Sequence, residues 1–438
     1  MVYSEDYKKL VDAAALKDKY YEIDERVEEI CKEAFKGCDK LEEIVMPKKL
    51  KKIDSEAFQG CSSLTKLTLP DSVARIDGLA FCGCSGLTEL TLPNSVKSIG
   101  DGAFADCSGL EKITVESGNS RYDSRDNCNS IIDKKTNTLI AGCKNSVIPN
   151  SVARIDGLAF CGCSGLTELT LPNSVKSIGD GAFADCSGLE KITVESGNSC
   201  YDSRDNCNSI IETETNTLIA GCKNSVIPNS VTSIGNSAFC GCSGLTELTL
   251  PDNIHFIEGE AFMGCSGLTE LTLPNSVKSI GDGAFAYCSG LTELTLPNSV
   301  KSIGRYAFQG CSGLTELTLP NSVKSIGDRA FAYCSGLTEL TLPNSVTSIG
   351  NCAFGGCSGL TELTLPNSIT SIGDYAFAYC SDLSKITSLA EIPPMCGFKV
   401  FNGVNKTNCE LIVPEGSVAA YTRAEDWNKF SNIRGFSK

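Results

Sequence analysis

The chain has 438 residues, of which 41% are hydrophobic, and a formal net charge of −15. This apolar content is enough for an extended core, and the negative charge argues against polyanionic partners such as nucleic acid and anionic membrane surfaces. No stretch of about 20 apolar residues occurs, so the sequence predicts no membrane-spanning segment.

Residues 1–22 are expected to form an N-terminal cap made of a helix and a first strand. Apolar residues recur at helical spacing within a charged segment, which predicts an amphipathic capping helix over residues 4–18. They are Tyr7, Leu10, Val11, Ala14 and Ala15. The segment lacks the apolar centre of a secretory signal peptide. The chain is therefore expected to be either a mature form whose leader was removed or a cytoplasmic protein.

A motif, Phe-x-x-Cys, returns every 23 residues through most of residues 23–388, and only two steps are longer, at 56 residues each. Fixed self-similarity of this length is typical of a solenoid, whose units bury their apolar sides against their neighbours. The thirteen cysteines of this period are Cys38, Cys61, Cys84, Cys107, Cys163, Cys186, Cys242, Cys265, Cys288, Cys311, Cys334, Cys357 and Cys380.

One unit, residues 291–313, shows how a coil is built. Leu294 and Leu296 alternate with polar residues, which predicts a strand with one buried face, and Pro-Asn then ends it. Residues 300–303 are predicted to be a second short extended piece, and residues 307–311 one helical turn facing the core. Equivalent strands of successive coils are expected to pair in parallel at about 4.8 Å.

The repeat L-x-x-I-x-L-P-x-x-V-x-x-I-G-x-x-A-F-x-x-C-x-x resembles that of the BspA-like leucine-rich repeat family over about residues 23–388. The resemblance implies an α/β repeat fold: a right-handed leucine-rich repeat solenoid with a continuous parallel β-sheet, short helical turns and a cap at each end. It also implies a secreted or cell-surface protein that acts in adhesion or partner binding, with no catalytic motif and no cofactor. Between Tyr21 and Leu411 the sequence predicts 17 coils.

Two insertions, near residues 115–147 and 194–226, account for the long steps. They belong to a duplicated block, because residues 73–151 and 152–230 differ at only four positions. In the first insertion, residues 130–132 and 138–141 flank a polar stretch and are predicted to form a hairpin. The hairpin is interpreted either as a projecting recognition element or as padding of a longer coil.

Residues 389–438 are expected to form a C-terminal capping unit. Cys409–Pro414 supplies a last strand, and residues 416–427 are predicted to form a short helix. Trp427, the single tryptophan, is expected to close the end of the core.

Most of the 25 cysteines are interpreted as buried free thiols, because equivalent side chains of adjacent coils point the same way and do not converge as a disulfide requires. The C-x-C pairs lack typical zinc spacing, and no metal site is predicted. Their first members, Cys82, Cys161 and Cys240, are expected at half-exposed positions. The insertion cysteines are interpreted either as free thiols or as partners in disulfide bridges within each hairpin. They are Cys128, Cys143, Cys207 and Cys222.

No catalytic residue is predicted, and the chain is expected not to be an enzyme. Its single histidine, His255, falls at an outward position where most repeats have Lys or Thr. The sequence contains no Ser/His/Asp arrangement, no phosphate-binding glycine loop and no H-E-x-x-H motif.

An outward strand position carries glutamate in six successive coils, here called the acidic strip, with a row of threonines beside it. Like charges in neighbouring strands repel, so a cationic partner would stabilise them. The candidate binding residues are Glu247, Thr249, Glu270, Thr272, Glu293, Thr295, Glu316, Thr318, Glu339, Thr341, Glu362 and Thr364. A second row, Lys278, Lys301 and Lys324, is expected on another face and is here called the basic strip.

The sequence thus predicts a non-enzymatic solenoid that binds a protein through its sheet face. The partner is expected to be a basic or host extracellular-matrix protein, with calcium as a further candidate ligand. The alternatives are a structural spacer, in which the strip is only a product of repeat copying, or an intracellular regulatory scaffold. Nothing in the sequence indicates the oligomeric state.

Overall fold

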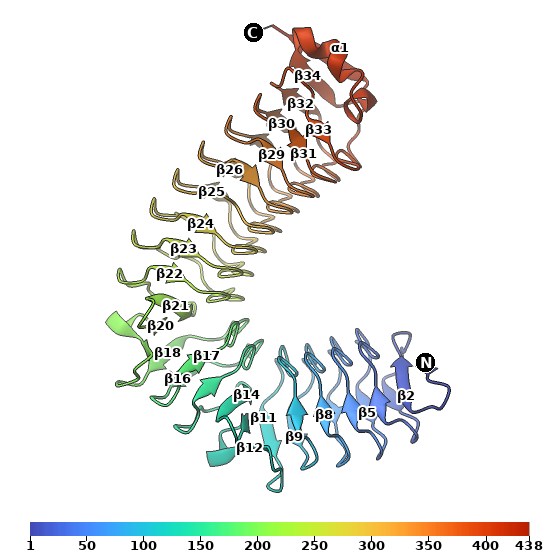
Figure 1. The fold of residues 1–438 in the computed structure, drawn as a ribbon, viewed down its shortest axis with the longest axis vertical. Helices are drawn as coiled ribbons and strands as arrows, with labels where there is room; N and C mark the ends of the chain where they lie inside the picture. The colour runs from blue at the N-terminus through green and yellow to red at the C-terminus, as the bar shows by residue number, and fades with distance from the viewer. Residues whose placement is uncertain (438) are drawn as a thin grey trace. The chain divides into compact units, whose positions relative to one another are not determined.

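The computed structural model describes residues 1–437, which fall into two compact units. Unit 1 comprises residues 1–214 and 220–224, and unit 2 comprises residues 215–219 and 225 onward. Each unit is a parallel β-solenoid in which most coils add a short strand to one or both of two ladders (Figure 1). The chain makes about 19 turns. The expected 17 omitted the turn before Tyr21 and the one after Leu411, where β2 and β35 lie.

The first ladder, here called the sheet face, contains the strand predicted at the start of each repeat. In unit 1 its strands are β3 (Tyr20–Glu22), β5 (Glu43–Val45), β7 (Lys66–Leu67), β9 (Glu89–Leu92), β11 (Lys112–Val115), β16 (Glu168–Leu171) and β18 (Lys191–Val194). In unit 2 they are β25 (Glu293–Thr295), β26 (Glu316–Thr318), β28 (Glu339–Thr341), β30 (Glu362–Leu365), β32 (Lys385–Ser388), β34 (Glu410–Pro414) and β35 (Asn432–Phe436).

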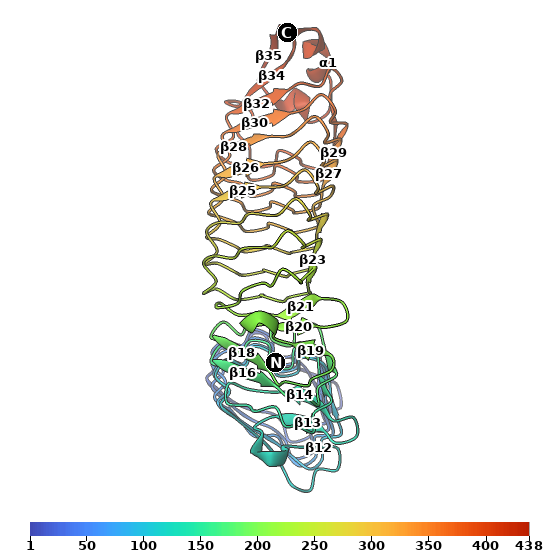
Figure 2. The same cartoon turned by 90° about the vertical axis from the view of Figure 1, so that its left-hand side faces the viewer.

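The second ladder contains the second extended piece of each repeat. In unit 1 its strands are β2 (Lys9–Asp12), β4 (Glu29–Ile30), β6 (Lys52–Ile53), β8 (Arg75–Ile76), β10 (Ser98–Ile99), β14 (Thr138–Ala141), β15 (Arg154–Ile155) and β17 (Ser177–Ile178). In unit 2 they are β21 (Thr217–Ala220), β22 (Ser233–Ile234), β23 (Phe256–Ile257), β24 (Ser279–Ile280), β27 (Ser325–Ile326), β29 (Ser348–Ile349), β31 (Ser371–Ile372) and β33 (Met395–Cys396). Figure 2 shows the two ladders of unit 2 on opposite sides of the coils.

Alternation of buried and exposed residues explains the sheet-face strands. In β9, Leu90 and Leu92 are buried, while Glu89 and Thr91 are exposed, as the period of two predicts. Strands pair in register with the next coil, so Leu294 lies opposite Leu317. The predicted parallel sheet is confirmed, and it is divided into short segments.

A column of phenylalanine rings forms the core. In unit 2 the rings stack nearly parallel from coil to coil, with centroids 5.1 Å apart for Phe262 and Phe285 and 5.5 Å apart for Phe354 and Phe377. Each ring is buried against those of the neighbouring coils, so the repeat is stabilised mainly through its neighbours.

The cysteine ladder lies beside this column, as predicted. Most of these thiols donate a hydrogen bond to the phenylalanine carbonyl of the preceding coil, for example Cys311 to Phe285 and Cys61 to Phe35, both at 3.2 Å. Cys38 and Cys163 donate instead to the carbonyls of Ala13 and Gly142. Burial raises the pKa of the Cys61 thiol to about 12, so the thiol remains a neutral donor at physiological pH. All 25 cysteines are free thiols, including those of the insertions.

The segment predicted as a helical turn is a series of tight turns. Within it, the Cys311 N–H donates to the Phe308 carbonyl, but the Phe308 N–H donates to Ala330 in the next coil. Tyr306, which precedes these residues, has a left-handed backbone with φ of 59°. The backbone donors therefore pair along the solenoid axis, which prevents an α-helix from forming.

The capping helix predicted over residues 4–18 is wrong. The structure has β1 (Val2–Tyr3) paired antiparallel with β2, and β2 paired in parallel with β4. Leu10 is fully buried, whereas Tyr7 and Val11 are about 40% exposed, so these residues do not share one buried helical face. Strand pairing prevails because it satisfies the backbone groups at the open edge of β4.

The inserted residues form a hairpin, as predicted, but the hairpin does not project. In unit 1, β12 (Tyr122–Asp123), η1 (Arg125–Asn127) and β13 (Ile131–Asp133) precede β14, and β13 pairs antiparallel with β14. β14 then pairs in parallel with β15, and most of its side chains are buried. The structure therefore favours padding of a longer coil. The second insertion has β19 (Tyr201–Asp202), η2 (Arg204–Asn206) and β20 (Ile210–Glu212).

The C-terminal end of unit 2 contains η3 (Glu415–Ser417), α1 (Val418–Tyr421) and η4 (Trp427–Lys429). Trp427 is fully buried, as predicted, and packs against Phe401 with ring centroids 5.2 Å apart. Its indole Nε1 donates to the Pro394 carbonyl at 2.9 Å. The last core ring is thereby covered, and the polar indole nitrogen is satisfied.

Candidate functional site

The acidic strip lies on the sheet face of unit 2. Glu293 is paired in register with Glu316, and Glu339 with Glu362, so glutamates occupy the same outward position in successive coils. All six glutamates are exposed, as are the threonines beside them except the half-buried Thr364. The structure therefore brings the predicted candidate residues together on one surface.

The N-terminal end of the strip departs from the expected strand geometry. Glu247, Thr249 and Glu270 lie outside the named strands, and Thr272 forms only an isolated bridge. The hydrogen bond from the Thr269 N–H to the Thr246 carbonyl is 3.4 Å long, against 2.8 Å between Thr361 and Thr338. The coils are therefore less tightly joined at this end.

Five of the six glutamates form no ion pair with any of residues 1–437: Glu247, Glu270, Glu293, Glu316 and Glu339. Only Glu362 is paired, with Lys385 at 2.9 Å, and its hydrogen bond raises the pKa of that lysine. Unit 1 differs, because its outward glutamates meet a lysine of the next coil. These ion pairs are Glu43–Lys66, Glu89–Lys112 and Glu168–Lys191.

Hydroxyl groups beside the carboxylates are also available. Within the part of the chain that the structure describes, the hydroxyls of Thr295, Thr318 and Thr341 form no side-chain hydrogen bond. Neighbouring threonines behave differently, since the Thr315 hydroxyl donates to the Thr292 carbonyl at 3.2 Å. The strip thus presents negative charge together with neutral donors and acceptors.

The basic strip lies on the second ladder of unit 2. Lys278, Lys301 and Lys324 are exposed, and none forms an ion pair with any described residue. His255, one coil earlier, is half-buried with Nδ1 3.3 Å from the Ser276 carbonyl oxygen.

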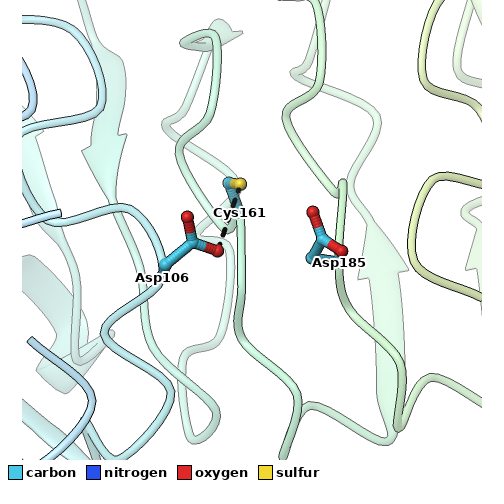
Figure 3. Close-up of side chains that lie close together, drawn as sticks. All are labelled: Asp106, Cys161 and Asp185. Carbon is cyan, nitrogen blue, oxygen red and sulfur yellow. Dashed lines mark hydrogen bonds between the residues drawn. The ribbon is translucent and has the colours of Figure 1, made fainter. Parts of the chain in front are cut away.

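A cysteine–aspartate cluster in unit 1 was not predicted. Figure 3 shows Asp106 and Asp185 on either side of Cys161, and one ligand atom from each lies within 4.8 Å of the other two. The Asp106 oxygens are 3.8 Å from the Cys161 sulfur and 3.6 Å from that of Cys82. Burial, with Asp106 contributing, raises the pKa of the Cys82 thiol to about 11. Thiol and carboxylate donors of this kind suit a zinc-like ion, but here the thiols serve as hydrogen-bond donors.

Spacing within a single coil gives no sign of this cluster, because its members belong to different coils. Asp106 occupies the position of Gly83 in the preceding coil, and duplication of the block places Cys161 between Asp106 and its copy Asp185. The half-exposed environment expected for the first cysteine of each C-x-C pair holds for Cys82. It is wrong for Cys161 and Cys240, which are buried.

Unit 1 also has a groove of about 1120 Å³ on its sheet face, beside β5, β7 and β9. Its lining includes Glu43, Lys66 and Glu89, whose charges are paired, and Glu116, which accepts a hydrogen bond from the Asn94 N–H at 2.9 Å. Because four of its six charged side chains already have partners, this groove offers less for an ionic ligand than the acidic strip does.

The two-ladder coil, the stacked aromatic core and the exposed sheet face define a leucine-rich repeat solenoid. The model for the BspA type leucine rich repeat region, with six copies, matches residues 15–132, 130–221, 218–338 and 301–407. The chain therefore belongs to the BspA-type leucine-rich repeat family. Members of the wider leucine-rich repeat class bind protein partners through such extended surfaces.

Solved structures with a similar coil include a leucine-rich repeat protein from Eubacterium ventriosum, at 22% identity and a TM-score of 0.52, covering 80% of this chain and 81% of that chain. Another, from Bacteroides ovatus, is 30% identical with a TM-score of 0.39 and covers 85% and 80%. A leucine rich cell surface protein from Faecalibacterium prausnitzii is 27% identical with a TM-score of 0.43 and covers 87% and 82%. A search among curated proteins found no match. Among residues 1–437, no helix is long and apolar enough to cross a bilayer.

Proposed function

We propose that the chain is a non-enzymatic, cell-surface or secreted interaction protein that binds a basic protein through the acidic strip. The observation that carries this proposal is the set of five exposed glutamates in successive coils that form no ion pair with any of residues 1–437. A basic partner would relieve their mutual repulsion, and the free threonine hydroxyls would supply hydrogen bonds. The surface location follows from what the family resemblance implies.

The test is a binding measurement on the purified full chain against a panel of purified extracellular-matrix proteins, with and without calcium. The test variant carries Glu270→Lys, Glu293→Lys and Glu316→Lys. A matched control carries Asp252→Lys, Glu258→Lys and Asp382→Lys, which make the same charge change at exposed positions of unit 2 outside the strip.

We expect saturable binding that weakens at least about tenfold, or 1.4 kcal/mol, in the strip variant and much less in the control. Binding that depends on calcium and on the same glutamates would identify the ion as a bridge. Equal binding by wild type and the strip variant would exclude the acidic strip. Absence of binding to every panel member by a folded chain would instead support a structural spacer.

A further inference from the structure

Unit 2 carries two rows of opposite charge on different faces. The acidic strip follows the sheet face, and the basic strip follows the second ladder, on the opposite side of the coils (Figure 2). Val300 and Ile303 of the second extended piece and the Phe308 ring are buried between the two faces. The two strips of one molecule therefore cannot neutralise each other.

The two strips have the same spacing. Each advances by one residue per 23-residue coil, and the stacked core rings set the rise per coil, at 5.3 Å between Phe285 and Phe308 and between Phe308 and Phe331. Three lysines in successive coils therefore match the separation of three successive glutamates. The three lysines can therefore lie opposite any three successive glutamates of the acidic strip.

Neither strip is satisfied within the chain. Among residues 1–437, Lys278, Lys301 and Lys324 have no ion-pair partner, and neither do Glu270, Glu293 and Glu316. In unit 1, charged residues at the outward strand position form ion pairs between adjacent coils, as Glu89 and Lys112 do at 3.6 Å. Unit 2 thus carries two complementary rows of charges that form no ion pair with each other or with the rest of the described chain.

We infer that a second copy of this chain is a partner of the acidic strip, with the basic strip of one molecule lying along the acidic strip of the next. The inference rests on the proposed function, because it uses the same glutamates. The contact is heterologous, so a pair of molecules retains one free strip of each sign and further copies can add side by side. Exposed ion pairs are individually weak and screened by salt, so the association is weak and depends on ionic strength.

The experiment is sedimentation velocity of the full chain over a range of concentrations at about 50 mM and about 500 mM salt, where screening differs strongly. One variant carries Glu270→Lys, Glu293→Lys and Glu316→Lys, and therefore reverses three successive charges of the acidic strip. The other carries Lys278→Glu, Lys301→Glu and Lys324→Glu, and presents two acidic strips. Each is measured alone, and the two are then mixed.

The wild-type chain should associate at low salt and be monomeric at high salt, and each variant alone should be monomeric. The mixture should associate at least about tenfold more tightly than either variant alone. The off-strip control with Asp252→Lys, Glu258→Lys and Asp382→Lys, mixed with the acidic variant, should show no such gain. A monomeric wild type at low salt, a mixture that stays monomeric, or an equal gain with the control would overturn the inference.

The same variants distinguish a failure of this self-association from a failure of the proposed function. Reversal of the basic strip should abolish self-association but leave binding to an extracellular-matrix protein unchanged. Reversal of three charges of the acidic strip should abolish self-association and also weaken binding to the matrix protein at least about tenfold.

Discussion

Replacement of Phe308 by alanine should weaken unit 2 strongly but locally. The ring is fully buried and stacks at 5.3 Å on both Phe285 and Phe331, so the substitution removes two aromatic contacts and leaves a cavity. A buried Phe→Ala change costs about 3–5 kcal/mol, to which each stacked pair contributes about 0.5–1.5 kcal/mol. Because a coil is stabilised by its neighbours, the loss should be confined to the adjacent coils.

Native-state hydrogen exchange, read by mass spectrometry on peptides from each coil, would measure this effect. Peptides spanning residues 285–331 should lose protection by about 3 kcal/mol or more, while peptides from unit 1 should keep theirs. The control Ser312→Ala, at an exposed position beside Cys311, should stay within about 0.5 kcal/mol of wild type. A loss below about 1 kcal/mol, or an equal loss in every peptide, would refute the nearest-neighbour account.

Two further predictions concern the thiols and the C-terminal end. Burial raises the pKa of the Cys61, Cys163 and Cys380 thiols to about 12, from an ordinary value of 9.0. Between those pH values the unfolded chain releases thiol protons that the native chain keeps. The free energy of unfolding should therefore be unaffected by these thiols below pH 9 and should decrease as the pH rises toward 12. Urea titrations across this range would check the sign, and a flat profile would contradict it. Trp427, buried and hydrogen-bonded to Pro394, should emit at short wavelength and shift to the red when the C-terminal cap opens. The substitution Trp427→Ala should cost about 3–5 kcal/mol in that cap, whereas a native emission typical of exposed indole would contradict the assigned position.

The coil itself was readable from the sequence because its period is local. Leu294, Phe308 and Cys311 recur at fixed offsets, and the structure places each of them in the core. The helix predicted for the N-terminal segment was wrong. The spacing of Tyr7 and Leu10 suits a helix, but the segment forms a strand that pairs with the open edge of β4. Propensity within one segment does not include the backbone groups that a neighbouring strand offers.

The sequence predicted which residues form the candidate site, but it did not predict which of their charges are paired. The sequence placed Glu293 and Glu316 in one row, and the register confirms it. Which glutamates are neutralised depends on the reach of lysines in the next coil, as for Glu362 and Lys385. Side-chain contacts between coils are not contained in the repeat pattern.

The amino-acid sequence by itself determined the repeat, the buried residues of each coil and the family, because each of these depends on a 23-residue period that recurs along the chain. Only the tertiary structure decided that the N-terminus joins the ladder as a strand, that the inserted hairpin lies within the wall, and that Asp106 meets Cys161. These features depend on which groups of successive coils come within bonding distance, and that proximity arises only when the coils stack.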